Sequence, residues 1–160
     1  MCVCRPCYLL FTHDGAGGGR FRAVPDRYVS LSGSVIAREG WDALQVPVGL
    51  AFFFRSSAHD RVVGFYPSPA GATESELALD AWSGIVRAAP ALESMAADVE
   101  ALLVNRRHES VDAFIVPIDV CYELVGQIRR DWRGFQGGDE LWRGVAEFFS
   151  RVASRAGVNE

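Results

Sequence analysis

The run from Val48 to Arg55 constrains the fold of this chain more than any other segment. Side chains of a strand alternate between its two faces. The first face would carry Val48, Leu50, Phe52 and Phe54, and the second Gly49, Ala51 and Phe53. Both sets are apolar, which is typical of a central strand that is covered on each side. The chain is therefore expected to build layers on both faces of a sheet.

Two pairs of strand-like segments flank short polar turns. The turn from Ser56 to Asp60 joins the first strand to Arg61–Tyr66, and the turn from Arg107 to Ser110 joins Glu100–Arg106 to Val111–Ile118. Strands joined by so few residues pair in antiparallel fashion. The sequence thus predicts two β-hairpins.

Apolar residues at helical spacing mark the helices. One helix is predicted over Trp82, Ile85, Val86 and Ala89, ending before Pro90, and a second short helix over Ala91 to Ala97. A third carries Cys121, Leu124, Val125, Ile128 and Trp132, with Asp119 as its N-cap. The last begins near Asp139 and carries Leu141, Val145, Phe148, Phe149 and Val152.

These elements predict an α+β fold, a mostly antiparallel sheet built from hairpins with three or four helices packed on it. Residues 1–160 suit a single domain, with residues 1–18 as a cysteine-containing segment that ends in a Gly-rich turn. We further expect a strand over Val3–Thr12, an edge strand over Phe21–Leu31 that Pro25 interrupts, and a short helix or turn over Ala37–Leu44.

Charge and hydropathy narrow the function. The formal net charge is −4 and the chain has no lysine, which argues against a nucleic-acid partner. The longest apolar run, Val46 to Phe54, is far shorter than the ~20 residues of a membrane span. The N-terminus shows no signal-peptide pattern, so we expect a cytoplasmic protein without a membrane partner. In a reducing compartment, closely spaced cysteines favour metal or redox chemistry over structural disulfides.

The strongest chemical motif is the series Cys2, Cys4 and Cys7, followed by His13. Three thiolates and one imidazole can form a tetrahedral zinc site, so these four residues are the candidate metal ligands. Two alternatives remain open. The cysteines can be unligated thiols, or Cys4 and Cys7 can act as a C-x-x-C redox pair.

Three weaker signals complete the candidates. The segment Pro67–Glu76 can line an enzyme pocket near Asn105 and Arg106, although Thr73 and Glu76 also have capping-box spacing. The two hairpin turns hold His59 and His108, each beside arginines, and would form a basic patch if they were neighbours. The arginines concerned are Arg55, Arg61, Arg106 and Arg107. Cys121 lies on an apolar helix stripe, which indicates a small buried hydrophobe.

Several stretches resemble a bacterial family of unknown function. They are Val46–Ser57, Tyr66–Ser75, Val99–Arg106, Val116–Tyr122 and Asp131–Gly134. The resemblance covers nearly the whole chain.

The resemblance implies a biological context. Genes of this family often lie beside nickel–iron hydrogenase genes in actinobacteria and related groups. Its members carry a C-x-x-C upstream of the part that matches Cys4–Cys7, and the two pairs resemble the knuckles of a zinc ribbon or rubredoxin. The upstream pair would lie before Met1. We therefore expect a non-catalytic accessory or adaptor protein that binds a hydrogenase or its maturation machinery, with zinc as the possible ion of an N-terminal Cys knuckle.

Overall fold

The computed structural model describes residues 22–31, 48–68, 70–75, 79–107, 110–134 and 137–157, together with the single positions 15, 18, 41, 42, 44 and 46. Predictions that concern other residues, the strand over Val3–Thr12 among them, lie outside this described part.

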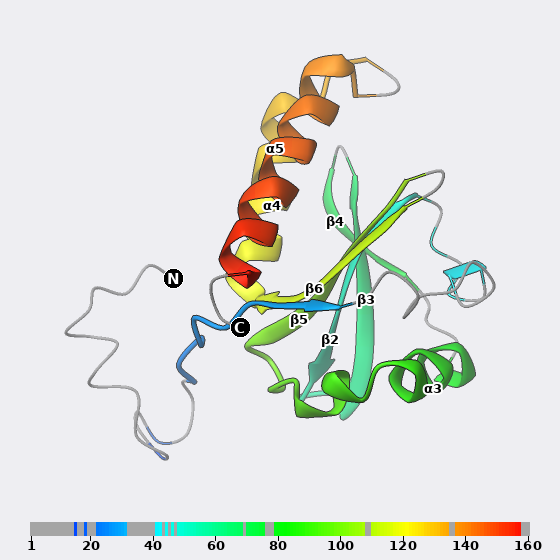
Figure 1. The fold of residues 1–160 in the computed structure, drawn as a ribbon, viewed down its shortest axis with the longest axis vertical. Helices are drawn as coiled ribbons and strands as arrows, with labels where there is room; N and C mark the ends of the chain where they lie inside the picture. The colour runs from blue at the N-terminus through cyan, green and yellow to red at the C-terminus, as the bar shows by residue number, and fades with distance from the viewer. Residues whose placement is uncertain are drawn as a thin grey trace.

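A six-stranded sheet forms the centre of the described structure (Figure 1). Its strands are β1 (Val29–Leu31), β2 (Leu50–Ser56), β3 (Arg61–Ser68), β4 (Gly71–Ser75), β5 (Glu100–Arg106) and β6 (Val111–Pro117). Their spatial order is β1-β6-β5-β2-β3-β4, and each neighbouring pair is antiparallel. Both predicted hairpins are confirmed as β2–β3 and β5–β6.

Helices cover both faces of this sheet (Figure 1). On one face pack α4 (Ile118–Asp131) and α5 (Asp139–Ala156), and on the other α3 (Leu79–Ala88) and the short 3-10 helix η3 (Pro90–Ser94). The predicted fold class, an antiparallel α+β sheet with helices packed on it, is confirmed.

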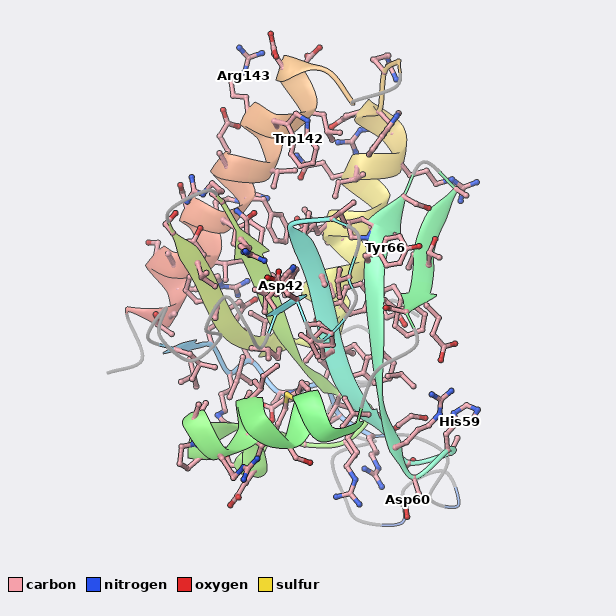
Figure 2. All side chains as sticks on the ribbon, turned by 90° about the vertical axis from the view of Figure 1, so that its right-hand side faces the viewer. Asp42, His59, Asp60, Tyr66, Trp142 and Arg143 are labelled. Carbon is pink, nitrogen blue, oxygen red and sulfur yellow. The ribbon has the colours of Figure 1, made fainter. Side chains whose placement is uncertain are left out.

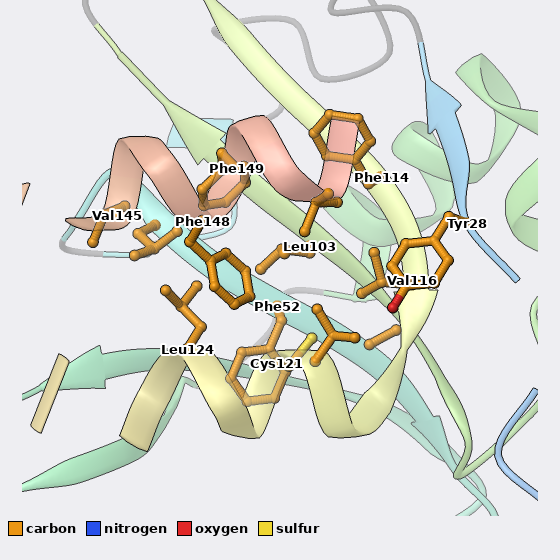
Figure 3. Close-up of a cluster of buried hydrophobic side chains, with 14 of the residues drawn as sticks. Tyr28, Phe52, Leu103, Phe114, Val116, Cys121, Leu124, Val145, Phe148 and Phe149 are labelled. Atoms are coloured by element: carbon orange, nitrogen blue, oxygen red, sulfur yellow. The ribbon is translucent and has the colours of Figure 1, made fainter. Parts of the chain in front are cut away.

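Strand β2 divides the two hydrophobic cores, as its apolar faces predicted. Phe52 packs with the aromatic and aliphatic side chains beneath α4 and α5 (Figure 3). Phe53 packs with the core beneath α3. Both phenylalanines are essentially inaccessible to solvent. Full burial of a side chain of this size stabilises a fold by about 1.5–3 kcal/mol. If β2 lay at the edge of the sheet, much of this stabilisation from both phenylalanines would be lost.

The start of α4 differs from the prediction. Pro117 is the N-cap, and Asp119 lies within the first turn, where its Oδ1 accepts a 3.0 Å hydrogen bond from the amide of Val120. The preceding strand β6 runs directly into the helix at Pro117, which fixes the helix start before Asp119 is reached. The carboxylate still lies at the positive end of the helix dipole.

Two segments form less or more strand than predicted. Among the described residues of Phe21–Leu31, only β1 is strand, since Pro25 has no amide hydrogen to donate to a sheet. Strand β1 is an edge strand that pairs with β6. The described residues of Pro67–Glu76 complete β3 and form β4, with a tight turn around Ala70. Thr73 pairs with Tyr66 in this hairpin, so its prediction as a helix cap is wrong.

Candidate functional site

A pocket of about 510 Å³ opens at one end of the sheet, where the first half of α5 crosses it. Its lining comes from the entry to β2, from the end of β5 and from α5: Gly49, Leu50, Asn105, Arg106, Arg107, Trp142, Val145 and Ala146. We call it the Asn105 pocket. Its volume is in the range of pockets that hold a small ligand or a bound side chain.

A close backbone approach forms one wall of the Asn105 pocket. The amide of Arg106 donates a 2.6 Å hydrogen bond to the carbonyl of Gly49. A side chain at Gly49 would collide with the carbonyl oxygen of Arg106, so only glycine permits this contact. The residue before β2 is thereby held against the end of β5.

Helix α5 places an indole at the rim of the pocket. Leu141 is buried in the core, and so is Val145 one turn later, which fixes the rotation of the helix. Trp142 lies beside this buried stripe and remains 46% exposed. Figure 2 shows it between α4 and α5, at the end of the molecule opposite His59. A half-exposed tryptophan offers a large apolar surface.

The most informative side chain is that of Asn105. It is only 7% exposed, and it lies on β5 between Leu50 of β2 and Asp112 of β6. Within the described residues its carboxamide makes no hydrogen bond, yet no fully inaccessible side-chain N or O atom there lacks a partner. The carboxamide must therefore be reached from the pocket that it lines. A buried donor and acceptor left open in this way favour a ligand that supplies the missing partners.

Two arginines contribute guanidinium groups to the lining, and each is paired with a carboxylate. Arg107 is 57% exposed and forms a 2.6 Å ion pair with Asp112, while Arg106 pairs with Asp42 at 3.0 Å. Each of these ion pairs engages one nitrogen of a guanidinium that has five N–H donors. Asp42 and Asp112 offset these charges, but neither carboxylate belongs to the described lining, so the charged groups of that lining are the guanidinium groups.

The predicted metal ligands Cys2, Cys4, Cys7 and His13 all lie outside the described residues. The metal site therefore stays a prediction. Among the residues that the structure does describe, no group of three or more His, Cys, Asp or Glu side chains is arranged to hold an ion.

Cys121 is the described cysteine, and its predicted burial is confirmed. It lies in the core between α4 and the sheet, close to Phe52 and Val116 (Figure 3). Burial, with a smaller contribution from the carboxylate of Asp119, raises the pKa of the thiol far above its ordinary value. Such a thiol is inert toward electrophiles near neutral pH.

The predicted basic patch of two neighbouring hairpin turns is wrong. Strands β2 and β5 are neighbours but antiparallel, so the turn that holds His59 and the turn that follows Arg106 lie at opposite ends of the sheet. His108 lies outside the described residues. Arg55 pairs with Asp60 at 3.0 Å and Arg61 with Glu74 at 2.9 Å, which neutralises the charge around His59.

The structure does not bring the described part of Pro67–Glu76 to Asn105 and Arg106 as the predicted enzyme pocket requires. None of this segment belongs to the described lining of the Asn105 pocket, whereas Asn105 and Arg106, its expected neighbours, do. Sequence reasoning missed Trp142. The available signal was its position directly after Leu141, the first residue of the apolar stripe of the last helix. This position lies beside the stripe, and a large aromatic side chain is unusual on such a solvent-facing surface.

Together, the antiparallel sheet, the helices on both faces and the pocket at one sheet end define an α+β protein with a small concave pocket. In a scan against family models, residues 1–156 match the family described as "Family of unknown function (DUF5947)". The chain belongs to this family, as its resemblance implied. No curated protein and no solved structure matches it. In the described part of the chain, no helix combines the length and the apolar character that crossing a membrane requires.

Proposed function

We propose that this chain is a non-catalytic adaptor that binds a protein partner through the Asn105 pocket. One observation carries the proposal: Asn105 is more than nine-tenths buried, and its open carboxamide lines a pocket whose rim holds the half-exposed indole of Trp142. A fold that keeps such a group keeps a feature that costs stability in the absence of a ligand.

The composition of the pocket supports a protein partner. Tryptophan and arginine are the residues most enriched among those that dominate protein–protein binding energies. Here Trp142 and Arg107 are exposed at the rim, while Leu50 and Val145 are buried at the base. A central apolar recess with a polar rim is the arrangement expected where one anchoring side chain of a partner is inserted.

The resemblance to a hydrogenase-linked family suggests which partner to test. We propose a nickel–iron hydrogenase or a protein of its maturation machinery. The N-terminal cysteines Cys2, Cys4 and Cys7, with His13, would add a zinc-binding knuckle to the adaptor, and thiolate ligands suit this ion. Metal content and partner binding are separable properties and need separate measurements.

The test is co-purification of the full chain with the hydrogenase subunits and maturation proteins encoded in the same genome. Trp142→Ala is expected to abolish recovery of the partner, because the anchoring surface is lost. Tyr122→Ala is the matched control, since Tyr122 is 51% exposed on α4 but does not belong to the described lining of the pocket. Equal recovery by both variants, or none by the unmodified chain, would remove this function. Elemental analysis of the same preparation reports the zinc.

A further inference from the structure

We infer that the occupant of the Asn105 pocket is the C-terminal residue of the partner polypeptide, held by its free carboxylate, its apolar side chain and the peptide group that precedes it. This inference rests on the proposed function and names the chemistry that the pocket recognises. Three features of the lining carry it.

The first feature is the carboxamide of Asn105. It offers both an N–H₂ donor and a carbonyl acceptor. A peptide group presents the complementary pair, a carbonyl acceptor and an N–H donor. Because Asn105 makes no side-chain hydrogen bond within the described residues, a bound peptide group would satisfy it without breaking any described contact.

The second feature is the charge of the rim. Arg107 lies two residues beyond Asn105 along the chain, roughly 7 Å in extended backbone, and its flexible side chain is 57% exposed. Among the described residues, its side chain is hydrogen-bonded to Asp112 alone. The guanidinium therefore retains N–H donors for a second carboxylate, and charge-assisted hydrogen bonds of this kind are the strong ones.

The third feature is the apolar base. Leu50 and Val145 are buried, and the exposed Ala146 and the half-exposed Trp142 belong to the same lining. An aliphatic side chain placed here would lose its water contact against four apolar groups. The base thus favours an apolar residue over a polar one.

A single residue unites these three requirements only at the end of a chain. An internal aspartate or glutamate has a carboxylate but no aliphatic side chain beyond it, and an internal leucine has no carboxylate. The C-terminal residue carries both, and the peptide group before it lies one bond away from the same Cα. Capture of a terminal carboxylate is an established mode of peptide recognition.

Isothermal titration of the full chain with synthetic peptides tests the inference. The probe is an acetylated hexapeptide of alternating alanine and glycine that ends in leucine with a free carboxylate. Its comparison is the same peptide with a C-terminal amide. We expect the free acid to bind at least about tenfold more tightly, the factor that one charge-assisted hydrogen bond provides. Absence of binding by the acid, or equal affinity for acid and amide, would overturn the inference.

Variants locate the binding. Asn105→Leu is expected to weaken binding of both peptides, and Arg107→Gln to remove the preference for the acid. Arg143→Gln is the control, because Arg143 adjoins Trp142 on α5 without belonging to the described lining (Figure 2). If Arg143→Gln has the effect of Arg107→Gln, or Asn105→Leu has none, the pocket is not the site. N-acetyl-leucine that binds as tightly as the hexapeptide would make a small carboxylate the ligand and overturn the peptide.

Failure of this inference is distinguishable from failure of the proposed function. Co-purification that depends on Trp142, combined with equal binding of acid and amide peptides, would leave the adaptor function intact and overturn only terminal recognition. Selective binding of the free acid without any hydrogenase partner would support terminal recognition and overturn only the proposed partner.

Discussion

Replacement of Asn105 by leucine tests the central observation directly. The two side chains are similar in size and branching, so the change removes the carboxamide without a large change in packing. Asn105 is 7% exposed and lies between buried or half-buried residues of β2 and β6. Leucine would extend the apolar base formed by Leu50 and Val145. We expect Asn105→Leu to increase the free energy of unfolding.

The size of the gain follows from the state of the carboxamide. Leaving a buried polar group without a partner costs about 1–3 kcal/mol. Access from the pocket lets water relieve part of this cost, so the lower half of the range applies. A gain of about 1.5 kcal/mol would raise the melting temperature by about 3–6 °C, since 1 kcal/mol shifts a domain of this size by about 2–4 °C. Leucine also suits an extended strand better than asparagine.

Urea unfolding followed by circular dichroism measures the change, provided that the slope against denaturant stays constant. Ser56→Ala is the contrasting variant, because the hydroxyl of Ser56 is buried but bonded to Nδ1 of His59 at 3.0 Å. It should lose about 0.5–1.5 kcal/mol, the net value of one hydrogen bond. A loss of stability in Asn105→Leu as large as that in Ser56→Ala would show that the fold needs the carboxamide, and the reasoning would be refuted.

Three further outcomes follow from the described contacts. Gly49→Ala should lower the melting temperature by several degrees, because its methyl group would collide with the Arg106 carbonyl; thermal unfolding that is unchanged would contradict the close approach. The thiol of Cys121 should resist Ellman's reagent until urea unfolds the chain. The free energy of unfolding should fall as the pH rises above about 8.5, because the thiol ionises there in the unfolded chain but stays protonated, with its raised pKa, in the fold. Cys121→Ala should make this pH dependence weaker. Burial alone would raise the pKa of Asp98, but hydrogen bonds from Ser57 outweigh this effect and lower the pKa. The carboxylate therefore stabilises the fold above about pH 4, and this contribution is lost on further acidification. Asp98→Asn should lose less stability in acid than the unmodified chain, and an equal loss would contradict the assignment.

The elements of this fold were predictable where local sequence decides the structure. The apolar alternation around Phe52 and Phe53 indicated a strand covered on both faces, and the structure buries both rings. The helical spacing of Leu141 and Val145 likewise predicted which face of the last helix enters the core. The spacing of apolar residues along the sequence indicates which side chains are buried. A sheet packed between two helical layers requires such buried side chains on both of its faces.

Strand order was not predictable from the same patterns. The short turn of a hairpin determines that its two strands pair with each other. No local sequence pattern indicates that β5 pairs with β2 in antiparallel fashion. This pairing separates His59 from Arg106 and brings Leu50 beside Asn105. The segment Pro67–Glu76 was expected to line a pocket or to cap a helix, whereas its described residues complete β3 and form β4. The prediction failed where tertiary pairing overrides local preference.

The position of Asn105 explains why a side chain that suits ligand binding in the pocket lowers the stability of the fold. Along β5, the residues on the same face as Asn105 are Ala101 and Leu103, and both are buried in the apolar core beneath α4 and α5. A third apolar residue would continue that core to the end of the sheet. With asparagine at this position, the apolar core stops at Leu103, and the carboxamide lies in the same pocket lining as Trp142. Of the other buried polar side chains, Ser56 and Glu100 are bonded within the fold, whereas the hydroxyl of Ser75, like the carboxamide of Asn105, makes no hydrogen bond among the described residues. Asn105 differs from Ser75 in lining the Asn105 pocket, where the proposed partner would satisfy it. Ligand binding should therefore stabilise the unmodified chain by more than it stabilises Asn105→Leu, in which no group is left to satisfy.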